Sequence, residues 1–195
     1  MNDLLLRSDE GEALSMNLQR WLDSTAVEDE ELLGKAIEPV LDVGCGPGRH
    51  LVSLNERGIV AMGVDASAHA VQMATSRGVP ALQRSVFDPL PGTGRWGTLL
   101  ILDGSIGIGG DPEALVCRGA ELLRRGGLIL VEIEPPGART RILRARLEAD
   151  GEHTLWFPWA LVGIDSITEL AAACELEVKE KWSSGMRWFA SLRKP

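Results

Sequence analysis

Three glycines at alternate positions, Gly44, Gly46 and Gly48, follow a short apolar run and precede a stretch of helical character. A turn without Cβ atoms lets a ligand approach both the backbone and the positive N-terminal end of a helix. The spacing differs from the G-x-G-x-x-G pattern of dinucleotide-binding turns, because Arg49 stands where the last glycine of that pattern would fall. A P-loop is excluded as well, since no Gly-Lys-Ser/Thr follows. The turn therefore favours a nucleoside ligand without a diphosphate.

Carboxylates accompany the apolar runs that flank this turn. Asp42 lies in the run before the glycines, and Asp65 ends the next run along the chain. A carboxylate at the position of Asp65 can accept hydrogen bonds from two neighbouring hydroxyl groups, and such charge-assisted bonds are strong. Asp65 could instead cap the helix that follows, and Asp42 is equally suited to hold the loop backbone or to touch the ligand.

Short apolar runs alternate with helical stretches through the first two thirds of the chain. Predicted strands occupy residues 39–43, 59–64, 81–83, 98–102 and 128–133, and predicted helices occupy 49–57, 67–77 and 111–125. The strands are continuously apolar rather than alternating, which is typical of a parallel sheet covered on both faces. The pattern predicts a doubly wound α/β fold.

The run from Val40 to Arg49 resembles motif I of the class I S-adenosylmethionine-dependent methyltransferases, whose usual form is hydrophobic-Leu-Asp-hydrophobic-Gly-x-Gly-x-Gly. Later segments at 86–88, 99–104 and 122–130 resemble further family motifs, although Arg125 replaces the usual proline. The resemblance covers roughly residues 38–134. It implies a Rossmann-like, mostly parallel seven-stranded sheet with an antiparallel C-terminal hairpin. It also implies S-adenosylmethionine as methyl donor and S-adenosylhomocysteine as product.

The same resemblance implies which residues contact the cofactor. Asp65 matches the family acid that hydrogen-bonds both ribose hydroxyls, Asp88 matches the acceptor for the adenine amino group, and Phe87 would flank adenine. Because Asp88 precedes Pro89, it could equally initiate a turn. The full set of implied cofactor-binding residues is Asp42, Gly44, Cys45, Gly46, Gly48, Asp65, Ala66, Phe87, Asp88 and Asp103.

The chain is expected to form a single methyltransferase domain, residues 1–195, with four parts. These are an N-terminal helical lid or cap over 1–38, the S-adenosylmethionine-binding core over 39–134, an irregular substrate-side insertion over 135–164, and a C-terminal helix and hairpin over 165–195. The hairpin prediction depends on two apolar, partly alternating runs that are joined by a Ser-Ser-Gly turn.

Methyl transfer from a sulfonium is an in-line displacement that alignment and water exclusion can accelerate, so a general base is optional. Of the three histidines, His50 is interpreted as structural and His69 as a surface residue, which leaves His153 as the candidate catalytic base. His153 precedes an aromatic cluster at 156–159 that either walls an acceptor pocket or packs the insertion onto the sheet. We expect a small-molecule acceptor, with oxygen slightly favoured over nitrogen.

Composition narrows the classes of partner. The 195-residue chain has a net charge of -8, which argues against a nucleic-acid partner, and no apolar run approaches the ~20 residues of a membrane span. Cys45, Cys117 and Cys174 lack metal-site spacing, so we expect free thiols, a cytoplasmic location and no metal. The protein is expected to be a monomer or homodimer. The alternative function is a non-catalytic S-adenosylmethionine-binding sensor or partner subunit.

Overall fold

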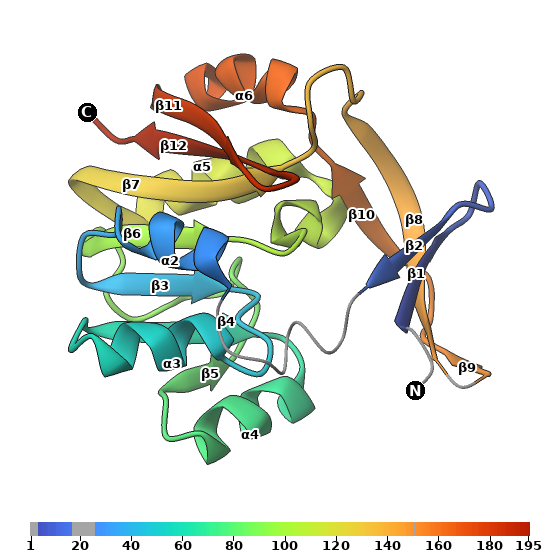
Figure 1. Ribbon diagram of the computed structural model, residues 1–195, viewed down its shortest axis with the longest axis horizontal. Coiled ribbons are helices and arrows are strands. Elements are labelled where there is room, and N and C mark those ends of the chain that lie inside the picture. The colour runs from blue at the N-terminus through green and yellow to red at the C-terminus, as the bar shows by residue number, and fades with distance from the viewer. Residues whose placement is uncertain (1–3, 17–25, 150) are drawn as a thin grey trace.

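The computed structural model describes residues 4–16, 26–149 and 151–195, and its larger β-sheet has seven strands (Figure 1). These strands are β3 (Val40–Val43), β4 (Ala61–Asp65), β5 (Ala81–Gln83), β6 (Trp96–Ile101), β7 (Leu123–Ile133), β11 (Glu177–Ser184) and β12 (Arg187–Arg193). They lie in the order β11-β12-β7-β6-β3-β4-β5. The strands from β7 to β5 are parallel, whereas β12 and β11 form an antiparallel hairpin on β7. The predicted α/β class and C-terminal hairpin are confirmed.

Helices cover both faces of this sheet. They are α2 (Val27–Leu33), α3 (Arg49–Glu56), α4 (Ala68–Ser76), α5 (Pro112–Leu122) and α6 (Ile167–Ala173), with 3-10 turns η1 (Ser105–Gly110) and η2 (Ile164–Ser166). Alternate side chains of β6 show the two-sided packing. Leu100 belongs to the core cluster that contains Leu32 of α2 and Leu54 of α3. Leu99 belongs to the other cluster, with Leu115 of α5. Both faces of β6 are therefore buried, as the continuous apolar run predicted.

A second, smaller sheet stands beside the first (Figure 1). Its strands are β1 (Leu4–Ser8), β2 (Ala13–Met16), β8 (Arg141–Ala149), β9 (Glu152–His153) and β10 (Phe157–Leu161), with the order β10-β8-β1-β2 and β9 paired to β8. The expectation of an irregular insertion at 135–164 is therefore wrong, because β8 alternates apolar residues such as Leu143 and Leu147 with charged ones such as Arg144. The expected N-terminal helix is wrong for residues 4–8 and 13–16, which are strands. Residues 1–3 and 17–25 of the expected lid lie outside the described residues.

The start of β7 also differs from the prediction. The helix predicted to reach residue 125 ends at Leu122, and β7 begins at Leu123 rather than at 128. Leu123 pairs with Trp96 of β6, and the Gly126 N–H donates to the carbonyl oxygen of Lys194 at 2.9 Å. Pairing with neighbouring backbone therefore extends the strand through a segment that local sequence assigns to a helix end and turn.

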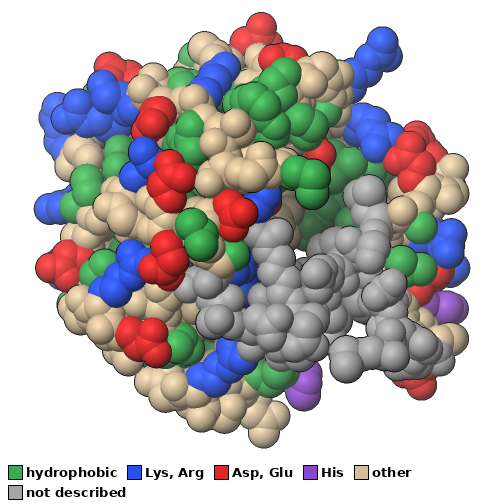
Figure 2. Space-filling model, in the orientation of Figure 1, with side chains coloured by type: hydrophobic (Ala, Val, Ile, Leu, Met, Phe, Trp, Pro, Cys, Tyr) green, Lys and Arg blue, Asp and Glu red, His purple; other side chains and the backbone are tan. Residues whose placement is uncertain are grey.

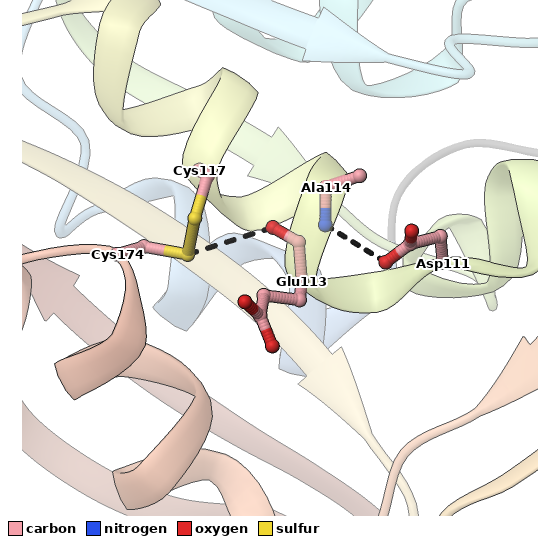
Figure 3. The surroundings of a disulfide bond; sticks show 5 residues. All are labelled: Asp111, Glu113, Ala114, Cys117 and Cys174. Atoms are coloured by element: carbon pink, nitrogen blue, oxygen red, sulfur yellow. Dashed lines mark hydrogen bonds between the residues drawn. A yellow bond between two sulfur atoms is a disulfide. The ribbon is translucent and has the colours of Figure 1, made fainter.

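Two cysteines expected to be free thiols form a disulfide (Figure 3). Cys117 lies in α5, and Cys174 directly follows α6, with 4.7 Å between their Cα atoms. The bond links two helices of one core cluster across a sequence separation of 57. The thiol expectation holds for Cys45 alone, which is free and buried. Because Cys117 and Cys174 are bonded to each other, these two cysteines do not support the inference from free thiols to a reducing compartment.

Candidate functional site

A cavity of about 550 Å³ lies between the carboxyl ends of the parallel strands and the second sheet. One side is formed by the glycine turn after β3 and by residues that follow β4 and β6. The other side comes from the second sheet, and we call its four cavity-lining side chains the roof: Leu6, Leu147, Phe157 and Trp159. A cavity of this size at the carboxyl ends of parallel strands is typical of small-molecule sites in α/β proteins.

The glycine turn supplies backbone to this cavity. Gly44 and Gly46 have φ values of 70° and 52°, in the left-handed region that favours glycine. A Cβ atom on Gly44 would lie 2.6 Å from Oγ of Ser105, so a larger residue there would push η1 away. A Cβ atom on Gly46 would meet no described atom within 4 Å. The backbone at Gly46 is thus open for a ligand to approach.

Asp65 closes the turn from the neighbouring strand. Its Oδ2 accepts a hydrogen bond from the Gly46 N–H at 2.9 Å, and its Oδ1 accepts from the Ser67 N–H at 2.8 Å. Ser67 caps α4, because its own hydroxyl oxygen accepts from the Ala70 N–H. A carboxylate offers about four acceptor positions, so both oxygens of Asp65 retain capacity toward the cavity.

Beneath the turn lies a group of buried and half-buried ionisable side chains, which we call the charge cluster. Its members are Asp29, Asp42, Arg49, His50, Asp103, Glu132 and Arg187. Arg49 of α3 bridges Asp29 of α2 and Asp103 after β6, the latter at 2.8 Å. Arg187 of β12 donates to Asp29 at 2.5 Å and to Glu132 of β7 at 2.6 Å. The charge cluster therefore joins α2, β3, α3, the end of β6, β7 and β12.

Neighbouring cations keep two acids of the charge cluster, Asp29 and Asp103, ionised. Burial alone would raise the pKa of Asp29, but contacts with His50, Arg49 and Arg187 hold it well below its usual range. The pKa of Asp103 is likewise low despite burial, because of the charges of His50 and Arg49. Neither carboxylate is therefore a strong proton acceptor at neutral pH.

His50 lies at the centre of the charge cluster and lines the cavity. Its Nδ1 is 3.6 Å from Oδ2 of Asp42, and its Nε2 is 3.7 Å from Oδ1 of Asp29. Burial alone would lower the pKa of His50, but contacts with Asp29 and Asp42 raise it to about 9. Oδ2 of Asp42 and Nε2 of His50 are both buried, and neither has a hydrogen-bond partner within the part of the chain that the structure describes. At neutral pH the imidazole is a cation rather than a base.

Cys45 lines the cavity between the two glycines and is 6% exposed. Burial first, and then the charges of Asp42 and Asp65, raise the pKa of its thiol far above the usual range. Because only a thiolate is a strong nucleophile, this sulfur is unreactive.

Most of the implied cofactor-binding residues meet in one cavity. Those that line it are Asp42, Gly44, Cys45, Gly46, Asp65, Ala66 and Asp103. Gly48, Phe87 and Asp88 do not belong to this lining. The side chain of Asp88 accepts from the Ser85 N–H at 3.2 Å, so Asp88 ends a turn that begins at Ser85 rather than initiating one before Pro89. Contacts of these three residues with a cofactor stay predictions.

The histidines are placed differently from the sequence expectation. His153 is exposed on β9, with its Nδ1 3.2 Å from the carbonyl oxygen of Thr154, and it does not line the cavity. Its role as a base stays a prediction to which this placement gives no support. His69 is exposed, as expected, yet it borders the cavity, and His50 lies directly in the cavity wall.

The aromatic cluster divides between two environments. Phe157 and Trp159 line the cavity, and their rings meet edge to face with centroids 5.8 Å apart. Trp156 lies outside the lining, under the guanidinium group of Arg146 at 4.8 Å. Leu6 and Leu147 also line the cavity but were not predicted from the sequence, where their one signal is the period-two pattern of the strands that carry them.

Comparison with known proteins agrees with this geometry. Residues 40–127 match the family model of a methyltransferase domain, and no curated protein sequence matches the chain. An S-adenosylmethionine-dependent methyltransferase from Bacteroides fragilis, in complex with S-adenosyl-L-homocysteine, has a TM-score of 0.83 at 22% identity, covering 98% of this chain and 87% of that chain.

Two further solved structures share the fold. The 1,6-didemethyltoxoflavin-N1-methyltransferase from Burkholderia thailandensis has a TM-score of 0.66 at 17% identity, covering 89% of this chain and 80% of that chain. A sugar N-methyltransferase from a Streptoalloteichus species has a TM-score of 0.65 at 21% identity, covering 91% of each chain. At these identities the structural likeness shows the fold.

Proposed function

We propose that this chain is a class I S-adenosylmethionine-dependent methyltransferase, which transfers a methyl group from S-adenosylmethionine to a small-molecule acceptor. The observation that carries the proposal is the pairing of Asp65 with the open backbone of Gly46 at the cavity. A carboxylate with spare acceptor positions beside an unobstructed glycine suits a ribose next to a sulfur-bearing chain, and it offers no diphosphate site.

The residues present fit this cofactor. Asp65 would accept from the ribose hydroxyls, and the Gly44–Gly46 backbone would lie along the cofactor. Met73 and Val86, which both line the cavity, offer apolar surface for the adenine ring. Oδ2 of Asp42 is buried and receives no hydrogen bond from residues 4–16, 26–149 or 151–195, so it could accept one from a ligand in the cavity.

When bound, the cofactor supplies an electrophilic methyl group on a sulfonium sulfur. The described chain contributes alignment and the exclusion of water, because the cavity is enclosed by the roof on one side and by the turn on the other. His50 is charged and Asp103 is ionised at neutral pH, so neither is set to remove a proton from the acceptor. The proposal is therefore transfer by positioning. The preference for an acceptor oxygen over nitrogen stays a prediction from the sequence, because a hydroxyl acceptor would have to give its proton to a group other than these two.

We propose that the protein is a cytoplasmic monomer or homodimer that acts on a small-molecule acceptor, and that it binds neither nucleic acid nor membrane. Acidic and basic side chains are interspersed over much of the face in Figure 2. Within the described residues, each helix is too short or too polar to cross a bilayer. The proposal against nucleic acid is supported by the net charge of -8.

Calorimetric titration with S-adenosylmethionine, S-adenosylhomocysteine and NAD tests the cofactor. We expect the two sulfur nucleosides to bind and NAD not to bind. Asp65→Ala should weaken S-adenosylhomocysteine binding by about tenfold or more, because hydrogen bonds to a charged group contribute roughly 1.5–3 kcal/mol. Glu56→Ala, at the exposed end of α3, removes the same charge away from the cavity and should bind normally. Unchanged affinity in Asp65→Ala would contradict the assignment.

Transfer itself requires a second assay. Incubation with methyl-labelled S-adenosylmethionine and a small-molecule cell extract should yield a labelled product, whose mass spectrum identifies the acceptor atom. Cofactor binding without any labelled product would favour the alternative, a non-catalytic sensor or partner subunit.

A further inference from the structure

We propose that the roof is the binding surface for the methyl acceptor, and that this acceptor presents an apolar ring and carries no negative charge. The inference deepens the proposed function and rests on it. Its basis is the chemistry of the four roof side chains, their rigid support, and the charges on the opposite side of the same cavity.

The roof is one face of the second sheet. Leu6 of β1 pairs directly with Leu147 of β8, and Phe157 of β10 pairs with Ala145 of β8. Because successive side chains of a strand alternate between faces, residues 143, 145 and 147 share the cavity side. The roof side chains accordingly pack in one apolar cluster with Leu143 and Ala145. A ligand on this surface meets hydrocarbon and aromatic rings, which favours an apolar ring as its partner.

The roof is separate from the residues that resemble cofactor motifs. The motif residues that line the cavity follow β3, β4 and β6 of the large sheet, whereas every roof residue comes from the small sheet. Both groups line one continuous cavity. A cofactor held at the glycine turn would leave the roof as the surface for the second reactant.

Trp159 is held in place by glycines of η1. A Cβ atom on Gly107 would lie 2.5 Å from Cε2 of Trp159, and one on Gly110 would lie 2.7 Å from Cβ of Pro158. These glycines let η1 pack closely against β10, so the ring is fixed before a ligand arrives. A preformed aromatic surface binds a ring without the entropy cost of ordering it.

The opposite wall disfavours an anion. Three carboxylates line this wall, Asp42, Asp65 and Asp103. Of the cations in the lining, Arg49 and protonated His50 already face Asp103 and Asp42, and the exposed Arg84 donates to the carbonyl oxygen of Pro89. An anionic acceptor would add a further negative charge beside Oδ2 of Asp42, which has no hydrogen-bond partner among the described residues. Burying such a charge without a compensating cation is costly.

Two matched compounds test the charge preference on the wild-type protein. Naphthol is an uncharged aromatic hydroxyl compound, and naphthoate is its anionic counterpart of similar size. Each is titrated by ligand-observed NMR with S-adenosylhomocysteine at saturation. We expect naphthol to bind, and naphthoate to bind at least about tenfold more weakly. Absence of naphthol binding, or equal binding of the two compounds, would overturn the proposal.

Variants test the surface. Phe157→Ala and Trp159→Ala should each weaken naphthol binding by about tenfold while S-adenosylhomocysteine affinity is retained, which also shows that the variant is folded. Trp156→Ala is the matched control, because this neighbouring ring lies outside the cavity. Equal naphthol affinity in Phe157→Ala and Trp156→Ala would overturn the roof assignment. A wild-type protein that binds naphthol but not S-adenosylhomocysteine would instead refute the proposed function.

Discussion

Replacing Asp29 by asparagine removes one charge from the middle of the charge cluster and changes the side chain very little in size. Asp29 is 1% exposed and accepts from Arg49 and Arg187, with His50 at 3.7 Å. Its Oδ2 also accepts from the Ala26 N–H at the start of α2. The substitution leaves three neighbouring cations with one carboxylate fewer.

The expected cost follows from the burial of this pair. Removing one partner of a buried ion pair typically costs 3–5 kcal/mol, because the remaining charge stays buried without compensation. An asparagine oxygen can still accept from one arginine or from the Ala26 N–H. We therefore expect the lower end of that range, about 3 kcal/mol of unfolding free energy.

Urea unfolding at pH 7, followed by circular dichroism, measures this change as a lower midpoint at constant slope. Glu30→Gln is the control on the same helix, since Glu30 pairs with Arg57 at the surface with its side chain 45% exposed. A surface pair contributes only about 0–1 kcal/mol. If both variants lost the same small amount of stability, the buried pairing described for Asp29 would be refuted.

Three further outcomes are expected. The free energy of unfolding should fall as the pH rises from 6.5 through about 9, because the folded-state pKa of His50 is raised and the protonated form stabilises the fold. Urea titrations at a series of pH values measure this slope, which His50→Gln should lose. An unchanged slope in the variant would contradict the assignment of the pH dependence to His50. Reduction of the Cys117–Cys174 disulfide, which spans 57 residues, should lower the unfolding free energy by up to about 4 kcal/mol, and equal midpoints with and without reductant would argue against the bond. Gly63→Ala should lose about 1–3 kcal/mol, because its Cβ would lie 2.5 Å from Sγ of Cys45; a melting temperature equal to the wild-type value would show that this packing relaxes freely.

The parts of the site that sequence predicts are those whose residues are local and conformationally special. Gly44 and Gly46 adopt positive φ values at a strand end, and Asp65 ends the adjacent strand of the same parallel sheet. Parallel strands bring their carboxyl ends to one edge, so motif order alone places these residues together. The apolar runs of β3 and β6 also predict the central strands. Every residue of both strands is buried, and a strand covered on both faces is mostly apolar along its whole length.

The parts that sequence does not predict depend on contacts between distant segments. Arg187 meets Asp29 across a sequence separation of 158, and neither residue type nor local spacing signals that pair. Residues 135–164 look irregular in the sequence because the alternation of apolar and charged residues in β8 forms a strand only when β1 and β10 pair on either side of it. Cys117 and Cys174 show the same limit, since wide spacing between cysteines says nothing about distance in the fold.

The placement of β1 between β8 and β2 has a consequence during protein synthesis. Arg7 contacts Glu148 across 141 positions, so β1 emerges from the ribosome long before its partner strand exists. At roughly 5–20 residues per second the wait is on the order of ten seconds, during which the leucines at 4–6 have no β8 to pair with. The large sheet can assemble from β3 to β7 meanwhile, because these strands are translated before β8. The roof is therefore assembled only after these strands, and β11 and β12 of the large sheet, which follow β10 in the sequence, are added last.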